Sequence, residues 1–145
     1  MELRSVEELM DLLYACRGAR SAPGLGAGHV DPHQHALRTA ALLRRTRPAD
    51  KELQIAGLVH PIGPLLRPGD EAAHARCAAD AVRPLLGERV YRLVRGHAPE
   101  DDDLLRLRQA VEEGRSADFD AGVLEDWRTV LGLVAARNSR LGAVD

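Results

Sequence analysis

The chain has 145 residues, of which 45% are hydrophobic and 29% are charged, and its formal net charge is −2. This size is typical of one compact domain, and we expect a single domain over residues 1–145. The small net charge argues against a protein that holds nucleic acid or an anionic membrane through a basic surface. Only 3% of the residues are aromatic, so alanine and leucine must supply the packing, which favours helices over strands.

The ends of the chain and its cysteines bear on where the protein resides. No run of about 18 uncharged apolar residues is present, so we expect no membrane span. The acidic, amphipathic N-terminal segment is unlike a signal peptide. Two cysteines, Cys16 and Cys77, do not make a disulfide framework. Together these features predict a cytoplasmic protein.

The first predicted helices begin at recognisable capping residues. Ser5 followed by Glu8 forms a capping box, and the helix after it should end at about residue 17. A glycine-rich loop over residues 18–30 follows, without the pattern of a phosphate-binding loop. Asp31 caps a second predicted helix with Pro32 at its first position, ending near residue 45.

The second predicted helix carries two histidines, His33 and His35. Residues two apart point about 200° away from each other on a helix. We therefore expect at most one of the two to face the core.

The middle of the chain predicts a central helix and a turn. Asp50 caps a third helix that is apolar nearly all round, so it should lie at the centre of the protein. It should end near residue 60, because the residue before a proline is disfavoured in the α region. The segment HPIGPLLRPG then contains three prolines and two glycines, which indicates a turn with little regular structure.

Four more helices are predicted in the second half. Asp70 caps a helix to about residue 86, a short helix spans Glu88 to about Arg95, and the acids of residues 100–103 precede a helix through residue 113. The last helix spans about residues 118–140. It should bury Phe119, Val123, Leu124, Trp127, Val130, Leu131 and Val134. No segment alternates with period two, so the fold class is all-α, a bundle of about six to seven helices.

Histidine is the most prominent chemistry-bearing residue. The chain has six: His29, His33, His35, His60, His74 and His97. Within the predicted helices no pair has the i, i+4 spacing of a zinc-binding helix. Spacing alone therefore does not separate a metal site from independent, partly buried histidines that each make one hydrogen bond.

The segments around four of these histidines resemble the HD-domain superfamily. They are QHALRTAALL, LQIAGLVHPIGPLL, DEAAHARCAADAV and YRLVRGHAPE. The resemblance covers about residues 30–100 and is greatest to the branch of mixed-valent di-iron oxygenases, which contains myo-inositol oxygenase and a phosphonate-cleaving oxygenase. It implies a helical bundle whose inner faces meet at a metal site. It also implies that His35 and His60 are the first two ligands, and that His74 and His97 are the two later ones.

One departure from the family pattern bears on the metal. The family has an aspartate after the second histidine, but here the residue is Pro61, which has no ligand atom. A bridging carboxylate neutralises charge between two cations about 3.5–4 Å apart. We therefore expect an impaired or absent dinuclear centre. Two outcomes stay open: one divalent ion (Fe, Mn, Zn or Ni) held by imidazoles, or no metal, with the histidines packed as core residues.

The last ligand of the family, an aspartate late in the chain, has no clear counterpart. One alignment, on LVAARNSRL, puts Asn138 there, and a second, on LRLRQAVEEG, puts Val111 or Glu112 there. Further acids without motif support are Asp118, Asp120 and Asp126. Each of these is alternatively an ordinary polar surface position.

Three functions follow from these patterns. The first is a non-catalytic member of the superfamily that binds a small molecule or a partner protein. The second is a metal-dependent oxygenase or phosphohydrolase-like enzyme with an altered, mononuclear, histidine-rich site. The third is a small accessory protein, for which a homodimer is suitable although no heptad seam marks an interface. We expect a small-molecule ligand, with no nucleic acid and no membrane.

Two loops, over residues 18–30 and 96–103, are the candidates for the mouth of a ligand pocket, because both adjoin proposed ligands. The acids of residues 100–103 would repel phosphate and phosphonate there. Alternatively, they only favour the dipole of the helix that follows. Either way, the substrate of the phosphonate enzyme is not expected here.

Overall fold

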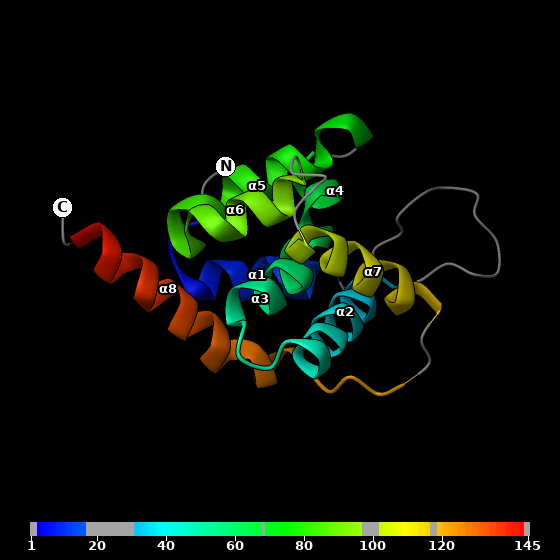
Figure 1. The fold of residues 1–145 in the computed structure, drawn as a ribbon. Helices are drawn as coiled ribbons and strands as arrows, with labels where there is room; N and C mark the ends of the chain where they lie inside the picture. The colour runs from blue at the N-terminus through cyan, green and yellow to red at the C-terminus, as the bar shows by residue number, and fades with distance from the viewer. Residues whose placement is uncertain (1–2, 17–30, 68, 97–101, 117–118, 144–145) are drawn as a thin grey trace.

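The computed structural model describes residues 3–16, 31–67, 69–96, 102–116 and 119–143. Within these ranges all regular structure is helical, which confirms the predicted all-α class (Figure 1). The α-helices are α1 (Val6–Ala15), α2 (Pro32–Thr46), α3 (Lys51–Val59), α4 (Gly63–Leu66), α5 (His74–Leu86), α6 (Glu88–Arg95), α7 (Asp102–Ser116) and α8 (Arg128–Ala143). Short 3₁₀ helices are η1 (His60–Ile62), η2 (Glu71–Ala73) and η3 (Leu124–Trp127). None of these described helices combines the length and apolarity that crossing a membrane requires.

The first three long helices begin where their capping residues predict. The Ser5 hydroxyl accepts the backbone N–H of Glu8 at 3.2 Å. Asp31 and Asp50 each accept the N–H of the third residue along, at 3.3 and 3.1 Å. These bonds satisfy N–H groups that the first turn of a helix leaves without a partner.

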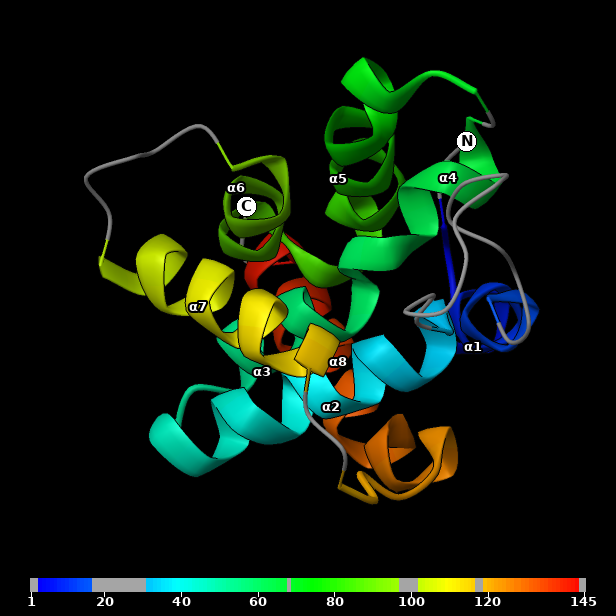
Figure 2. The same cartoon turned by 90° about the vertical axis from the view of Figure 1, so that its right-hand side faces the viewer.

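Helix α3 is the centre of the bundle, as its all-round apolar pattern predicts. Every residue from 53 to 59 is buried, and α2, α6, α7 and α8 pack around it (Figures 1 and 2). Gly57 allows α2 to approach closely, because a Cβ at this position would lie 2.6 Å from a Leu43 methyl and 3.0 Å from the Thr39 methyl. The end of α3 is thereby fixed against the middle of α2.

The other helices pack around α3 and against one another. Helices α5 and α6 lie side by side, α7 lies along α2, and α8 packs on α1, α3 and α5 (Figure 2). Trp127, just before α8, has no exposed surface and belongs to the same hydrophobic core as α1 and α3.

The segment predicted as a turn is helical instead. Residues 60–62 form η1 and residues 63–66 form α4. Pro61 and Pro64 each lie in the first turn of their helix. In the first turn of a helix the backbone N–H groups have no partner within the helix. Proline, which lacks this N–H, therefore loses no hydrogen bond there, and the two prolines are compatible with helix.

Helix α5 begins later than predicted. Asp70 does not cap it, because residues 71–73 form η2 and α5 starts at His74 without a side-chain cap. Pro84 does not end α5, which continues to Leu86. Gly87, with a φ of +97°, marks the boundary to α6, which spans the predicted residues.

The last helix also begins later than predicted. Gly122 has a φ of +83°, and the Asp120 carboxylate accepts its backbone N–H at 2.9 Å, so a turn holds this segment. Val123 is 59% exposed, and the expectation that it is buried was wrong. Helix α8 starts at Arg128 after the 3₁₀ turn η3, because the glycine and its aspartate interrupt the helical pattern.

Candidate functional site

Two of the predicted ligands lie together in the structure. His35, on α2, and His60, directly after α3, have ring centroids 5.2 Å apart and rings at 88° to each other. His35 is 9% exposed and His60 is half-buried. The close packing of α2 against α3 therefore produces a paired-imidazole cluster, which we call the histidine pair.

Each ring of the histidine pair is anchored to a backbone carbonyl. His35 Nε2 lies 2.7 Å from the Val111 carbonyl oxygen, and His60 Nδ1 lies 2.6 Å from that of Gly57. A carbonyl oxygen only accepts, so these two nitrogens carry the protons. In the neutral rings, Nδ1 of His35 and Nε2 of His60 are therefore the acceptor nitrogens.

Helix α7 packs directly against the His35 ring at Gly114. A Cβ at Gly114 would lie 3.0 Å from the His35 ring carbon Cδ2 and 2.9 Å from the Thr39 hydroxyl oxygen. The buried Thr39 hydroxyl is itself fixed, because it donates to the His35 carbonyl oxygen at 2.8 Å. Val111, a candidate for the last ligand, bonds this ring through its backbone oxygen.

The side chain of His74 is bonded to a different part of the fold from the histidine pair. It begins α5, and its Nε2–H donates to the Arg67 carbonyl oxygen at 3.0 Å. Gly63 lies against the backbone of His74, where no Cβ would fit. His74 thus fastens the start of α5 to the end of α4. His97, the fourth predicted ligand, lies outside the described residues, as does most of the two loops predicted to form a pocket mouth.

Asn138, the other candidate for the last ligand, links α8 to α5. Its side-chain amide donates to the carbonyl oxygens of Pro84 and Leu85 at 2.9 and 3.2 Å. These carbonyl oxygens belong to the last turn of α5, where the helix itself supplies no N–H group to bond them. The amide therefore acts as a cap supplied from another helix.

The remaining acidic candidates lie apart from the histidine pair or have no described contact with it. Asp120 and Asp126 hold the turn before α8, accepting from Gly122 and Val123 at 2.9 and 3.2 Å. Glu112 is exposed on α7, and Asp118 lies outside the described residues. In the described part of the chain no group of three or more His, Cys, Asp or Glu side chains could hold a metal ion.

His33 contradicts the expectation that only one histidine of α2 faces inward. His33 is 7% exposed, donates from Nδ1 to the Leu13 carbonyl oxygen at 3.1 Å, and stacks on Tyr14 with centroids 6.0 Å apart. The expectation failed because the end of α1, at Leu13 and Tyr14, contacts His33 near the start of α2, while α7 packs along α2 at His35. The sequence signal that could have predicted the burial of both histidines is that small or apolar residues lie on both faces of α2.

A charge cluster at the opposite end of α3 had no sequence signature. Arg89, on α6, holds both Asp50 carboxylate oxygens at 2.6 and 2.7 Å and Asp103 at 2.8 Å. Glu52 and Arg47 extend the cluster, through Arg89 at 3.3 Å and Asp103 at 3.4 Å. The hydrogen bond from Arg89 holds the pKa of Asp50 below its ordinary value. Part of the predicted acidic run is therefore neutralised within the fold.

The residues at the histidine pair do not fit a dinuclear metal centre. They supply two imidazoles, but the position after His60 is Pro61, and a bridging carboxylate is what keeps two cations together.

Comparison of the sequence with protein-family models and with curated proteins finds no match.

Proposed function

We propose that this chain is a non-catalytic relative of the HD-domain proteins, with an impaired or absent dinuclear metal centre, that binds a small molecule or assists a partner protein in the cytoplasm. The observation that carries the proposal is Pro61, directly after His60 and next to the contact between His60 and His35. At this position the resembled family has its bridging aspartate.

The hydrogen bonds of the other predicted ligands support the same proposal. His74 is bonded to the Arg67 carbonyl and Asn138 to the last turn of α5. Both side chains thus have a role in joining helices that needs no metal. We expect hydrogen bonds of this kind, which join helices, in a protein that kept the helical bundle of a metal enzyme but lost the carboxylates that bind the metal.

Metal analysis tests the proposal. The protein is purified without a nickel column and analysed by inductively coupled plasma mass spectrometry, and we expect iron and manganese well below one ion per chain. One or more tightly held ions per chain, kept through dialysis against a chelator, would contradict the proposal.

A mononuclear metal enzyme, an oxygenase or hydrolase, is the second candidate function. It is favoured by the 5.2 Å separation of the two imidazole rings, which is short enough for both to contact one ion at metal–nitrogen distances of about 2.0–2.1 Å. The remaining ligands would have to come from elsewhere, His97 among them.

Thermal melting with added Zn²⁺, Fe²⁺ or Ni²⁺ separates the two candidates. A native metal site would add about 2.7 kcal/mol of stability when the ion is a hundredfold above its dissociation constant. The double variant His35→Gln, His60→Gln would lose this rise. No rise in the parent protein excludes the metal enzyme and agrees with the non-catalytic proposal.

A further inference from the structure

Helix α8 has an apolar composition that its position on the surface does not account for. Residues 129–136, TVLGLVAA, contain no charged side chain, although 29% of the whole chain is charged. A surface helix ordinarily carries charged or polar residues on its outer side, whereas a helix that is apolar on all sides is ordinarily buried. Helix α8 is buried on one side, where it packs on α1, α3 and α5 (Figure 1).

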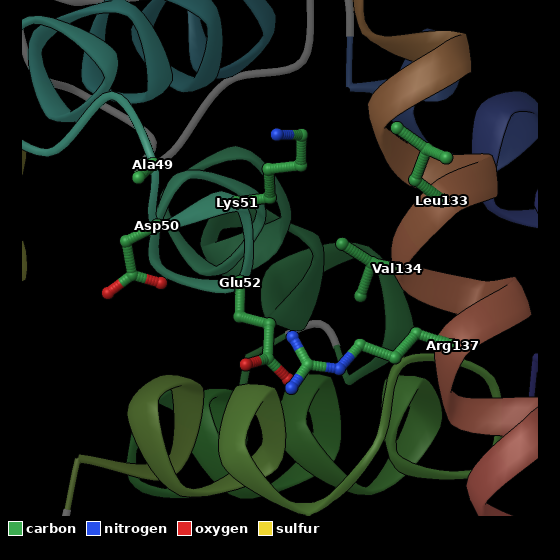
Figure 3. A pocket seen from close by; sticks show the side chains of 7 residues that line it. All are labelled: Ala49, Asp50, Lys51, Glu52, Leu133, Val134 and Arg137. Carbon is green, nitrogen blue, oxygen red and sulfur yellow. The ribbon is translucent and has the colours of Figure 1, made fainter.

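The other side of these two turns is an uncharged surface, which we call the α8 stripe. Its exposed members are Thr129, Leu133 and Ala136, with Gly132 half-buried between them. Residues three and four apart lie on one face of a helix, so these positions are contiguous. Leu133 is 50% exposed. Helix α3 does not cover it, because a pocket of about 380 Å³ lies between Leu133 and the start of α3 (Figure 3).

Opposite charges stand at the two ends of the α8 stripe. Asp126 precedes it and Arg137 follows it, both are exposed, and neither has an ion pair in the part of the chain that the structure describes. They are eleven residues apart, which is about three helical turns, so they lie on the same side of the helix. Arg137 extends toward Glu52 in Figure 3, but that carboxylate is already bonded to Arg89 at 3.3 Å.

This order of charges fits a second copy of the same chain. Across a two-fold axis each copy presents the same patch to the other. When the axis crosses two antiparallel α8 helices midway between residues 126 and 137, the two stripes cover each other. Asp126 of each copy then meets Arg137 of the partner subunit at both ends of the contact. A parallel arrangement would instead place like charges together, which is unfavourable.

We propose that the α8 stripe is the interface of a homodimer, in which two α8 helices pack antiparallel with Leu133 near the two-fold axis. Covering Leu133 and Ala136 removes apolar surface from water, which is favourable in proportion to the area covered. One pair of helices buries less than the about 1,600 Å² of a standard interface, so the dimer is weak, with a Kd of about 10–100 µM. The proposal does not depend on the histidine pair or on the function proposed above.

Sedimentation equilibrium of the full chain between about 5 and 500 µM measures the dimer. Leu133→Glu should raise the Kd at least about tenfold, because it places two carboxylates close together at the axis. The matched control is Leu105→Glu, which replaces a leucine of α7 that is 45% exposed, and it should leave the Kd unchanged. A parent protein that stays monomeric at about 500 µM overturns the proposal, whatever else binds the stripe, and so do equal effects of the two variants.

A charge exchange tests the antiparallel arrangement. Arg137→Glu and Asp126→Arg should each dimerise about tenfold more weakly than the parent, because each puts like charges at both ends of the contact. An equal mixture of the two variants restores both ion pairs and should dimerise as the parent does. A mixture that dimerises no better than either variant alone overturns the proposal. The fluorescence of Trp127 checks that each variant is folded, and if Asp126→Arg is not, the comparison of Leu133→Glu with Leu105→Glu decides.

Discussion

At the scale of single residues, the absence of a side chain at Gly114 decides how the His35 ring is packed. Helix α7 touches the ring and the Thr39 hydroxyl at the point where any Cβ would intrude. Neither neighbour can easily yield, because His35 is bonded to Val111 and Thr39 is bonded to the backbone of His35. Glycine here is thus a packing requirement, although glycine in a helix ordinarily destabilises it.

Replacing Gly114 by alanine should therefore destabilise the protein, by about 1–3 kcal/mol of unfolding free energy, through overpacking. The matched control is Gly132→Ala on α8, where a Cβ would meet no atom within 4 Å. That change should stabilise the protein by up to about 1 kcal/mol, because alanine favours helix. Urea unfolding of both variants is the measurement. Similar effects in the two would mean that the contact with His35 does not matter.

Cys16 makes a second residue-scale prediction, one that depends on pH. Burial, together with the negative charge of Asp31, raises the pKa of this thiol from about 9 to about 11. The unfolded chain therefore loses the proton first, so stability is full below pH 9 and falls between pH 9 and 11. The expected loss is about 2 kcal/mol by pH 11.

Denaturant unfolding at pH 7.5, 9 and 10.5 measures this effect, with Cys16→Ala as the control. The alanine variant should be less stable than the parent at pH 7.5, because it leaves a small cavity, and should lack this part of the alkaline decline. If parent and variant decline in parallel above pH 9, other groups cause the loss and the thiol does not contribute.

At the scale of elements, side chains from neighbouring helices complete the helix ends. Asp50 caps α3 and also receives Arg89 of α6, and Asn138 of α8 completes the end of α5. Each contact satisfies a group that the helix itself leaves open. The ends of α3 and α5 are therefore fixed partly by sequence-distant residues, which sets the positions of α6 and α8.

Removing the central cation of the charge cluster should uncouple these helices. Arg89→Gln removes the guanidinium that holds both oxygens of the half-buried Asp50 carboxylate and also contacts Asp103, and we expect a loss of about 1–3 kcal/mol of unfolding free energy at pH 7. The pKa of Asp50 is held below its ordinary value by Arg89. Its contribution is therefore present at neutral pH and is lost as the pH falls through the lowered pKa.

Urea midpoints at pH 7 and pH 3 provide the measurement. The difference between parent and variant should shrink at pH 3. The control is Arg92→Gln, one turn on in the same helix, where the side chain is 71% exposed and reaches only Glu88 at 4.0 Å. This change should alter stability by less than about 0.5 kcal/mol. An equal difference at both pH values would show that the Arg89 ion pairs are not responsible.

At the scale of the whole molecule, one hydrophobic core joins all the long helices. Buried residues of α1, α2, α3, α5, α6, α7 and α8 belong to a single cluster, and α3 lies inside it (Figure 1). The core is built largely from alanine and leucine, which lets the helices approach closely. Such a core should unfold in one cooperative transition.

Trp127, the only tryptophan, reports on that transition. It has no exposed surface, so its fluorescence should be blue-shifted in the native protein and shift to the red on unfolding. The fluorescence and far-UV circular dichroism midpoints in urea should coincide. A fluorescence change at lower urea than the loss of helix would show that the segment around η3 separates from the rest first.

Local sequence patterns were enough to predict the all-α class, the central position of α3, the starts of α1, α2 and α3, and the span of α6. These features depend on local propensity, capping and periodicity, which neighbouring residues carry. The resemblance to the HD-domain superfamily, on which the selection of His35, His60 and Pro61 rests, stays a prediction.

The surroundings of these residues came from the packing of helices against one another. It buried both His33 and His35, because the end of α1 contacts the first ring through Leu13 and α7 contacts the second through Val111. It placed Asn138 at the end of α5, and it brought Asp103 and Asp50 to Arg89 from 14 and 39 positions away. Such contacts depend on how helices cross in space, and no periodicity along a single chain segment encodes which distant side chain will complete a helix end or line a pocket.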